Sequence, residues 1–300
     1  MTPDEYLSKI LEEQTFDTDD QELKDLRTRR DEISKKLRSH FTKSSPSIRW
    51  AGSYAKGTMI RESYDIDMTC YFPSDETEAG TTLKAIYESV EAALEDEYRV
   101  ERKASSLRVF ELDSWTNDLH IDVVPGRYTD DKKSDVYLHR TSSEKERLKT
   151  NLQTHIDHIK NSGVVDSIRL MKLWKSRNGM ASVKTFVLEL LVVKLLEKKK
   201  SLSISEQLEY VWEEFRDNAE GLSVKDPANS NNDLKPVLDD CRFFLSSAAS
   251  AALSSVENYG WEEVFGDLDE EEASASGMKS ALSAAVASVS TPTKPYRAEE

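Results

Sequence analysis

The chain has 300 residues, of which 38% are hydrophobic and 32% are charged, and its formal net charge is −15. This length exceeds the usual size of one domain, so we expect one large domain or two tightly joined ones. Cations and counterion release supply most of the non-specific affinity for a phosphate backbone. The acidic balance therefore disfavours a long nucleic acid as an obligatory substrate, whereas small nucleotides with bound metal are less affected.

Cysteine usage and the apolar runs exclude several classes of protein. The two cysteines, Cys70 and Cys241, show no metal-ligand spacing, which argues against a disulfide framework or a structural zinc site and fits a reducing cytoplasm. The first residues carry acids and no long apolar run, unlike a secretory signal. The longest apolar stretch, 186–196, is interrupted by Glu189 and Lys194 and falls short of the roughly 20 residues of a membrane span. We expect a cytoplasmic protein without a membrane partner.

The first half of the chain changes from helical to mixed patterning. Leu23, Leu26, Ile33 and Leu37 recur at helical spacing on a charged background, which predicts an amphipathic helix over 20–41. Alternation and β-branched content then predict strands, separated by one apolar-periodic helix. These elements are a strand at 65–72, a helix at 83–94, and strands at 107–112 and 119–124 around the turn-like DSWTND.

From about residue 142 the pattern is helical. Ser143 and Glu146 form a capping-box pattern before apolar residues 148, 152, 156 and 159, and Gly163 follows as a stop signal. Two further helices are expected at 166–178 and 184–200. The second is apolar nearly all round and so should be buried, which makes an ion pair the expected state of Glu189 because an unpaired buried charge is costly. The polar loop DPANSNND precedes more helix, and the last residues of the tail are expected to be mobile.

Residues with catalytic chemistry concentrate in 51–72. Asp65 and Asp67 are two apart on a predicted strand, so their carboxylates project from one face. Two like charges on a half-buried strand repel each other, and a divalent cation with a preference for carboxylate oxygens removes that cost. Gly52 and Ser53, about a dozen residues upstream, offer backbone N–H groups and a hydroxyl to phosphate oxygens. Together they predict a phosphate cradle followed by a metal-binding strand.

A third acid is needed because two-metal phosphoryl transfer uses more negative charge than two carboxylates supply. Asp122 is the candidate: in LHIDVVPG, alternation leaves His120, Asp122 and Val124 on the face opposite Ile121 and Val123. The histidines show no metal-ligand grouping in the sequence, so His120 is interpreted as structural.

The string GSYAKGT, followed by SYDIDMTCYF and a later IDVVPG, resembles the nucleotidyltransferase superfamily that includes DNA polymerase β. The strings IRLMKLWKSRNG, KTFVLELLVV and KDPANSNND resemble the helical half of archaeal CCA-adding enzymes, oligoadenylate synthases and cyclic GMP-AMP synthase-like enzymes. In length and layout the chain is most similar to the CD-NTases of bacterial CBASS antiphage systems. The resemblance implies an α+β fold: a polymerase β-like core of mixed sheet with flanking helices, joined to a C-terminal helical domain.

The implied organisation has three parts, namely an N-terminal helix with the catalytic core at 1–140, a helical domain closing the nucleotide cleft at 141–266, and an acidic then Ser/Ala-rich tail at 267–300. The metal-binding acids of the family match Asp65, Asp67 and Asp122, which would hold two ions of Mg²⁺, or alternatively Mn²⁺. Asp122 would also help to activate the attacking ribose hydroxyl. The implied nucleotide-binding residues are Gly52, Ser53, Lys172 and Ser182, with Lys175 or Arg177 as alternatives to Lys172.

The function that the resemblance implies is synthesis of cyclic di- or trinucleotides from nucleoside triphosphates in antiphage defence, with regulatory or effector proteins of a defence operon as partners. One alternative is an RNA 3′-terminal transferase of the CCA-adding type, and another is a linear 2′–5′ oligonucleotide synthase. The latter usually needs a basic RNA groove, and the predicted first helix offers a strip of cations: Arg27, Arg29, Arg30, Lys35, Lys36 and Arg38. A non-catalytic nucleotide-binding or antitoxin module is disfavoured because the three acids are intact.

Overall fold

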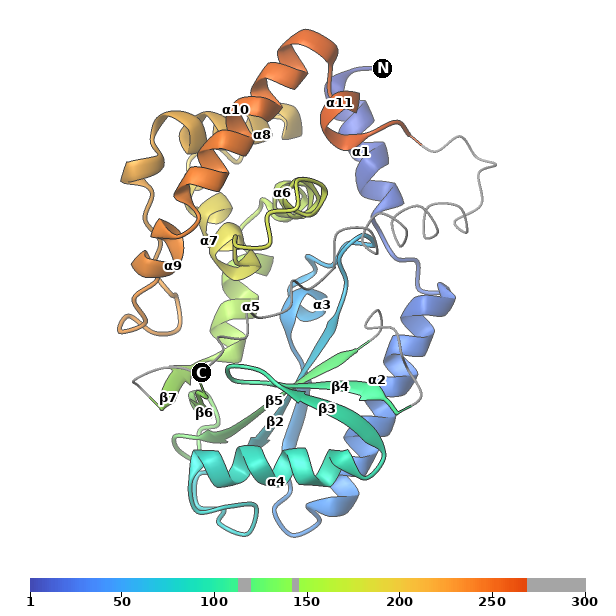
Figure 1. Ribbon diagram of the computed structural model, residues 1–300, viewed down its shortest axis with the longest axis vertical. Helices are drawn as coiled ribbons and strands as arrows, with labels where there is room; N and C mark the ends of the chain where they lie inside the picture. Colours follow the sequence, from blue (N-terminus) through green and yellow to red (C-terminus); the bar gives the residue numbers. More distant parts are fainter. Residues whose placement is uncertain (113–119, 142–145, 269–300) are drawn as a thin grey trace, which may run out of the picture.

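The computed structural model describes residues 1–112, 120–141 and 146–268, which form a sheet-containing lobe and a helical lobe (Figure 1). The strands are β1 Ser47–Trp50, β2 Ile66–Phe72, β3 Tyr98–Arg102, β4 Leu107–Glu111, β5 Ile121–Tyr128, β6 Val136–His139 and β7 Arg147–Thr150. The helices are α1 Pro3–Glu13, α2 Gln21–His40, α3 Gly52–Lys56, α4 Leu83–Glu95, α5 Leu152–Lys160, α6 Val165–Arg177, α7 Thr185–Leu195, α8 Ile204–Asp217, α9 Lys235–Asp239, α10 Arg242–Tyr259 and α11 Glu262–Phe265, with the short 3₁₀ helix η1 Ala219–Gly221.

The mixed sheet has the order β1-β2-β5-β4-β3, with β6 and β7 added beside β5. The β2–β5 pair is parallel, whereas the other pairs are antiparallel. Alternate residues such as Ile66, Met68, Ile121 and Val123 are fully buried against the apolar faces of α2 and α4. Because side chains alternate along a strand, the residues between them lie on the opposite face, toward the helical lobe.

The helical lobe has its own apolar core, centred on Trp174 of α6 and Trp212 of α8, both fully buried. The N-terminal helix α1 packs into this core with Tyr6, Leu7 and Ile10. The Tyr6 hydroxyl donates a hydrogen bond to the carbonyl oxygen of Gly266 at 2.5 Å, which places the start of the chain beside α11 (Figure 1). The two ends of the described chain therefore close the same lobe.

Most predicted elements are confirmed: the helix over 20–41 is α2, the strand at 65–72 is β2, and the helices at 83–94, 166–178 and 184–200 are α4, α6 and α7. The strands expected at 107–112 and 119–124 correspond to β4 and β5. The turn-like DSWTND, Ser143 and nearly all of the tail lie outside the described residues.

The helix expected from residue 143 is wrong at its start. Residues 147–150 form strand β7, and α5 begins only at Leu152. Asn151 is its N-cap, with the side-chain oxygen accepting from the Thr154 N–H at 3.0 Å. That side chain satisfies one of the unpaired N–H groups of the first turn, so the helix starts there although the apolar spacing continues upstream.

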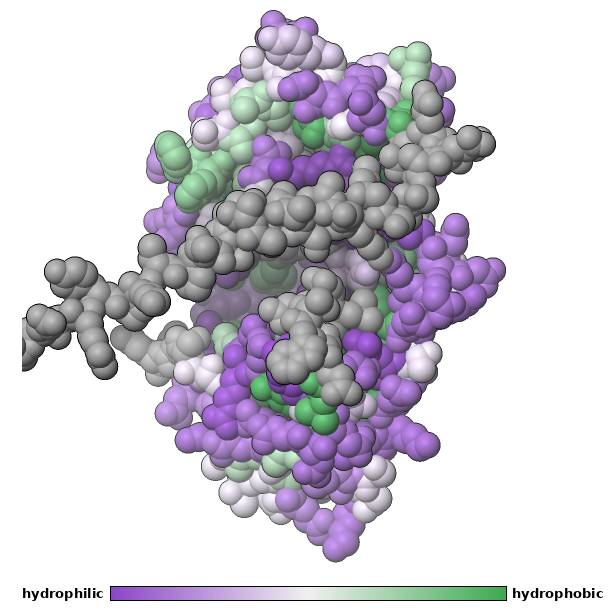
Figure 2. Space-filling view, turned by 45° about the vertical axis from the view of Figure 1, so that its right-hand side comes forward, coloured by the Kyte–Doolittle hydropathy of each residue, from purple (hydrophilic) through white to green (hydrophobic). Residues whose placement is uncertain are grey.

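The architecture agrees with the expected fold class, since a mixed sheet with flanking helices is joined to a helical half (Figure 1). Within the described ranges, no helix is both long and apolar enough to cross a membrane. Figure 2 shows the surface recessed between the lobes, with hydrophilic residues gathered over the sheet-containing lobe.

Candidate active site

The acids singled out from the sequence meet at the β2–β5 pair. Asp67 and Asp122 are register partners across these parallel strands, and Asp65 directly precedes β2. Their flanking residues, Ile66 and Ile121, are buried in the sheet core, so the carboxylates lie on the opposite face, toward the other lobe. The backbone hydrogen bonds of the ladder thus hold two of the three acids side by side.

The acids interact electrostatically with one another. Burial, together with the charges of Asp65 and Asp122, raises the pKa of Asp67 to about 7, against the opposing effects of Lys56 and Lys172. A carboxyl that is buried among like charges is stabilised by a divalent cation, because the cation offsets both the repulsion and the lost hydration. The electrostatics therefore favour metal binding at this point.

The group of side chains that could hold a metal ion contains two of the three acids. One ligand atom from each of Asp65, His120 and Asp122 lies within 4.8 Å of the others, and Asp67 is not in this group. His120 shows no metal-ligand grouping in the sequence, but in the fold it lies beside Asp65 and Asp122. The strand alternation that selected Asp122 also places His120 on the same face. Two carboxylates and an imidazole are suitable ligands for Mg²⁺ or Mn²⁺, with the nitrogen favouring the softer ion.

Gly52 and Ser53 begin α3, and Gly52 packs against the Asp67 carboxylate. Gly52 has φ 57°, and a Cβ built on it would lie 1.6 Å from Oδ2 of Asp67. Only glycine permits this backbone conformation together with this close approach. The Ser53 hydroxyl is buried and has no hydrogen-bond partner among the described residues. A buried hydroxyl of this kind is a ready donor to a ligand oxygen.

The two helical-lobe residues expected at the triphosphate are placed differently from each other. Lys172 is buried on α6, and its Nζ donates to the carbonyl oxygen of Thr58 at 2.6 Å. Burial lowers the pKa of Lys172 to about 8, and the charge of Glu189 opposes this shift. Ser182 is exposed in the connection between α6 and α7.

The two alternatives to Lys172 are engaged elsewhere. Lys175 donates to the Thr185 hydroxyl at 3.2 Å, and Arg177 forms an ion pair with Glu62.

Glu189 forms the buried ion pair that its apolar helix required. Its partner is Lys56 at the end of α3, and the Thr58 hydroxyl also donates to Glu189 at 2.8 Å. The prediction of an ion pair is thereby confirmed, with lysine as the partner. Because α3 belongs to the sheet-containing lobe and α7 to the helical lobe, this pair joins the two lobes.

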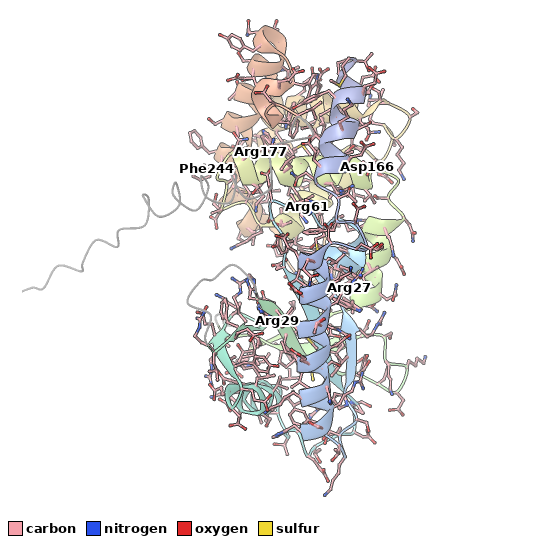
Figure 3. The ribbon with its side chains drawn as sticks, turned by 90° about the vertical axis from the view of Figure 1, so that its right-hand side faces the viewer. Arg27, Arg29, Arg61, Asp166, Arg177 and Phe244 are labelled. Carbon is pink, nitrogen blue, oxygen red and sulfur yellow. The ribbon has the colours of Figure 1, made fainter. Side chains whose placement is uncertain are left out.

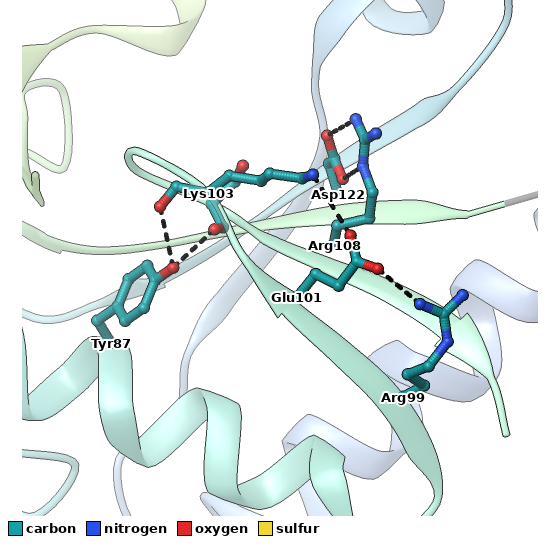
Figure 4. Close-up of polar contacts among 7 residues, drawn as sticks. Tyr87, Arg99, Glu101, Lys103, Arg108 and Asp122 are labelled. Atoms are coloured by element: carbon teal, nitrogen blue, oxygen red, sulfur yellow. Dashed lines mark hydrogen bonds and ion pairs between the residues drawn. The ribbon is translucent and has the colours of Figure 1, made fainter. Parts of the chain in front are cut away.

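Arg108 of β4 was missed by sequence reasoning. Its Nε and Nη2 donate to the two carboxylate oxygens of Asp122 at 2.9 and 3.0 Å (Figure 4). These hydrogen bonds raise the pKa of the guanidinium above its already high value. A signal was available, because Arg108 lies between the buried Leu107 and Val109 and so projects to the face of the acids.

The basic strip on α2 is largely used within the molecule. Figure 3 shows Arg27 and Arg29 along this helix. Arg27 donates to the Tyr54 hydroxyl, Arg29 pairs with Glu111 at 3.0 Å, and the Arg30 guanidinium lies 4.6 Å from the centre of the Trp50 ring. Lys36 pairs with Glu97 at 2.6 Å. Cations that are already paired offer less to a phosphate backbone, so the strip gives little support to an RNA groove.

The site combines three features. A parallel strand pair carries adjacent acids, Gly52 and Ser53 begin α3 next to them, and the helical lobe lies across the recess. These are the features of a nucleotidyltransferase of the polymerase β type. The family model for the Second Messenger Oligonucleotide or Dinucleotide Synthetase domain (SMODS) matches residues 1–162, more than half of the 300-residue chain. The chain therefore belongs to this family, which is described as synthesising second-messenger oligonucleotides or dinucleotides. The resemblance noted in the sequence is confirmed.

Solved structures share the fold over nearly the whole chain. CdnC of Escherichia coli MS115-1, solved with HORMA-deltaN, is 21% identical with a TM-score of 0.63, covering 90% of this chain and 98% of its own. CdnG of Bradyrhizobium diazoefficiens, solved with GTP, is 13% identical with a TM-score of 0.63, covering 89% and 96%. The cyclic AMP-GMP synthase DncV of Vibrio cholerae is 15% identical with a TM-score of 0.59, covering 90% and 86%. No curated protein sequence matches the chain.

Proposed function

We propose that this enzyme makes a cyclic di- or trinucleotide in antiphage defence, with Asp65, Asp67 and Asp122 as ligands of two catalytic Mg²⁺ ions. The observation that carries the assignment is the register pairing of Asp67 with Asp122 beside Asp65. The raised pKa of Asp67 supports it, because that carboxyl lies where a cation would be most stabilising.

The implied reaction is in-line attack of a 2′- or 3′-hydroxyl on the α-phosphorus, with pyrophosphate leaving. Bound cations would supply the neutralisation of phosphate charge. The chain's own groups supply positioning: Ser53 directs its buried hydroxyl to the donor triphosphate, and Gly52 leaves room for the Asp67 carboxylate. Asp122 orients the attacking hydroxyl and receives its proton. Lys172 and Ser182 contribute a cation and a hydroxyl from the helical lobe.

The solved structures with the same fold suggest classes of substrate and partner for this chain. CdnC has been solved with ATP, and CdnG with GTP, so purine nucleoside triphosphates are the first substrates to test. CdnC also forms a complex with HORMA-deltaN, which supports a regulatory protein partner for this chain. We assign the enzyme to the cytoplasm, in keeping with Cys70 and Cys241, which are both buried free thiols.

The test is incubation with all four ribonucleoside triphosphates and Mg²⁺ or Mn²⁺, followed by mass spectrometry of the products. A cyclic product that disappears in the Asp65→Ala/Asp67→Ala double variant supports the proposal. A product that forms only with added tRNA would indicate a terminal transferase, and linear 2′–5′ oligomers would indicate an oligoadenylate-type synthase. Nucleotide binding without any product from the wild type would indicate a binding module.

A further inference from the structure

A row of charged residues crosses the sheet at the acids. Glu101 of β3 is the register partner of Arg108, Arg108 is the partner of Asp122, and Asp122 is the partner of Asp67. Register partners lie side by side, so the row alternates in sign until it reaches two adjacent acids. Arg108 is therefore the cation nearest in register to the expected metal site.

Arg108 binds the third acid in a geometry that competes with metal coordination. The guanidinium donates to both oxygens of Asp122, at 2.9 and 3.0 Å (Figure 4), so a cation bound through the remaining lone pairs of these oxygens must lie close to its positive charge. A bidentate arginine–carboxylate pair is strong and fixes orientation. Unlike a lysine or histidine, arginine cannot lose its charge to make way.

We propose that Arg108 is a positioning residue that holds Asp122 in the metal-free enzyme and competes with the catalytic cation for its oxygens. The inference rests on the proposed role of Asp122 as a metal ligand. A cation bound to Asp122 would be repelled by the guanidinium, whose charge stays beside the site because its backbone is fixed in β4. Arg108 thus sets the metal concentration that the enzyme requires.

The proposed role of Arg108 predicts opposite changes in metal affinity and turnover, which a purely structural role does not. Replacing Arg108 with glutamine removes the competing charge, so the cation binds more tightly, by about ten-fold for the loss of one charge-assisted bidentate contact. Asp122 simultaneously loses the contact that orients it, so turnover falls although metal binding improves. A variant that merely disturbed the sheet would weaken metal binding and turnover together.

The experiment is a titration of the full chain with Mn²⁺, without nucleotide, in which free Mn²⁺ is measured by electron paramagnetic resonance. We compare wild type with Arg108→Gln and Arg108→Lys, the latter keeping the charge but not the bidentate fork. Arg99→Gln is the matched control, because it removes one positive charge from the neighbouring strand, where Arg99 pairs with Glu101 at 2.6 Å. Steady-state turnover is measured on the same preparations at saturating metal.

The expected result is an approximately ten-fold lower Kd for Mn²⁺ in Arg108→Gln, a smaller decrease in Arg108→Lys, and little change in Arg99→Gln. The glutamine effect should vanish in an Asp122→Asn background. Unchanged or weaker Mn²⁺ binding in folded Arg108→Gln, or an equal effect from Arg99→Gln, would overturn the inference. If Asp122→Asn alone leaves Mn²⁺ affinity unchanged, the proposed role of Asp122 fails instead, so the two failures are distinguishable.

Discussion

Two ion pairs flank the acids of this enzyme, and their surroundings differ. Lys56 and Glu189 join α3 to α7, with side chains 14% and 0% exposed, and the Thr58 hydroxyl completes the contacts of the glutamate. Arg108 and Asp122 join two strands, with side chains 29% and 11% exposed, beside two further acids. The buried pair joins the two lobes, whereas, by our proposal, the pair beside the acids shares Asp122 with a catalytic cation. The Lys56–Glu189 pair therefore links two lobes, and the Arg108–Asp122 pair modulates metal binding.

The strongest test of the acids beside the Arg108–Asp122 pair is Asp67→Ala. We expect product formation to fall by about 1,000-fold or more, because a lost metal ligand removes several kcal/mol of transition-state stabilisation. Metal-free thermal stability should be retained or improved, since a buried, repelled carboxyl is removed. Pyrophosphate release and differential scanning fluorimetry measure the two quantities. Asp75→Ala, an exposed acid beyond the end of β2, is the control and should keep full activity; comparable losses in both would contradict the assignment.

The buried Lys56–Glu189 pair between the lobes is tested by Glu189→Gln. Removing one partner of a buried ion pair leaves Lys56 uncompensated, which should lower the free energy of unfolding by about 3 kcal/mol. Urea unfolding followed by tryptophan fluorescence measures the change. The exposed pair Lys84–Glu88 provides the comparison, because Glu88→Gln should cost under about 0.5 kcal/mol. Equal effects of the two substitutions would mean that burial does not distinguish the pairs.

Gly52→Ala tests how closely α3 packs behind the acids. The added Cβ would meet Oδ2 of Asp67 at 1.6 Å, so the carboxylate must move, and a displacement of this size should lower turnover by about 100-fold. Gly57→Ala is the matched control, because Gly57 also has positive φ, at 75°, but an added Cβ there meets no atom within 4 Å. We expect Gly57→Ala to show only backbone strain, as a small loss of stability. An active Gly52→Ala enzyme would show that this packing is not needed.

The smallest expected effect is a pH dependence from Lys172. Burial lowers its pKa to about 8, so between about pH 8 and the ordinary lysine pKa the unfolded state binds more protons than the folded state. Stability from this group therefore rises with pH across that window, and its burial cost is fully present below it. Relative to Lys172→Met, wild type should gain between about 1 and 2 kcal/mol from pH 8 to pH 9.5. A flat difference in urea unfolding across this range would contradict the shift.

The sequence was informative wherever the structure depends on local spacing. The two-residue period placed Asp65 and Asp67 on one face and selected Asp122, and the apolar helix around Glu189 required a charged partner. It failed where a short polar signal overrode a longer pattern: residues 148, 152, 156 and 159 have helical spacing, but the Asn151 cap divides them between β7 and α5.

The pairing of Arg108 with Asp122 could not be assigned from spacing alone. Strand alternation gives the face on which an arginine lies, but its partner depends on which strands pair and in which register. The same holds for Lys56 with Glu189, which are 133 residues apart. Local patterns thus identified the charged residues, and only the tertiary arrangement identified their partners.

The β2–β5 ladder also determines how the enzyme tolerates changes in length. Asp67 and Asp122 are held opposite each other by seven consecutive register pairs, from Ile66–Ile121 to Phe72–Arg127, and not by the connections between the strands. Residues inserted between Pro73 and Thr82, before α4, would leave the separation of these two carboxylates unchanged. Asp65 lies just outside the paired stretch, so one residue inserted before β2 would displace it without moving the other two. The spacing of the acids is consequently robust to loop engineering on one side of β2 and fragile on the other.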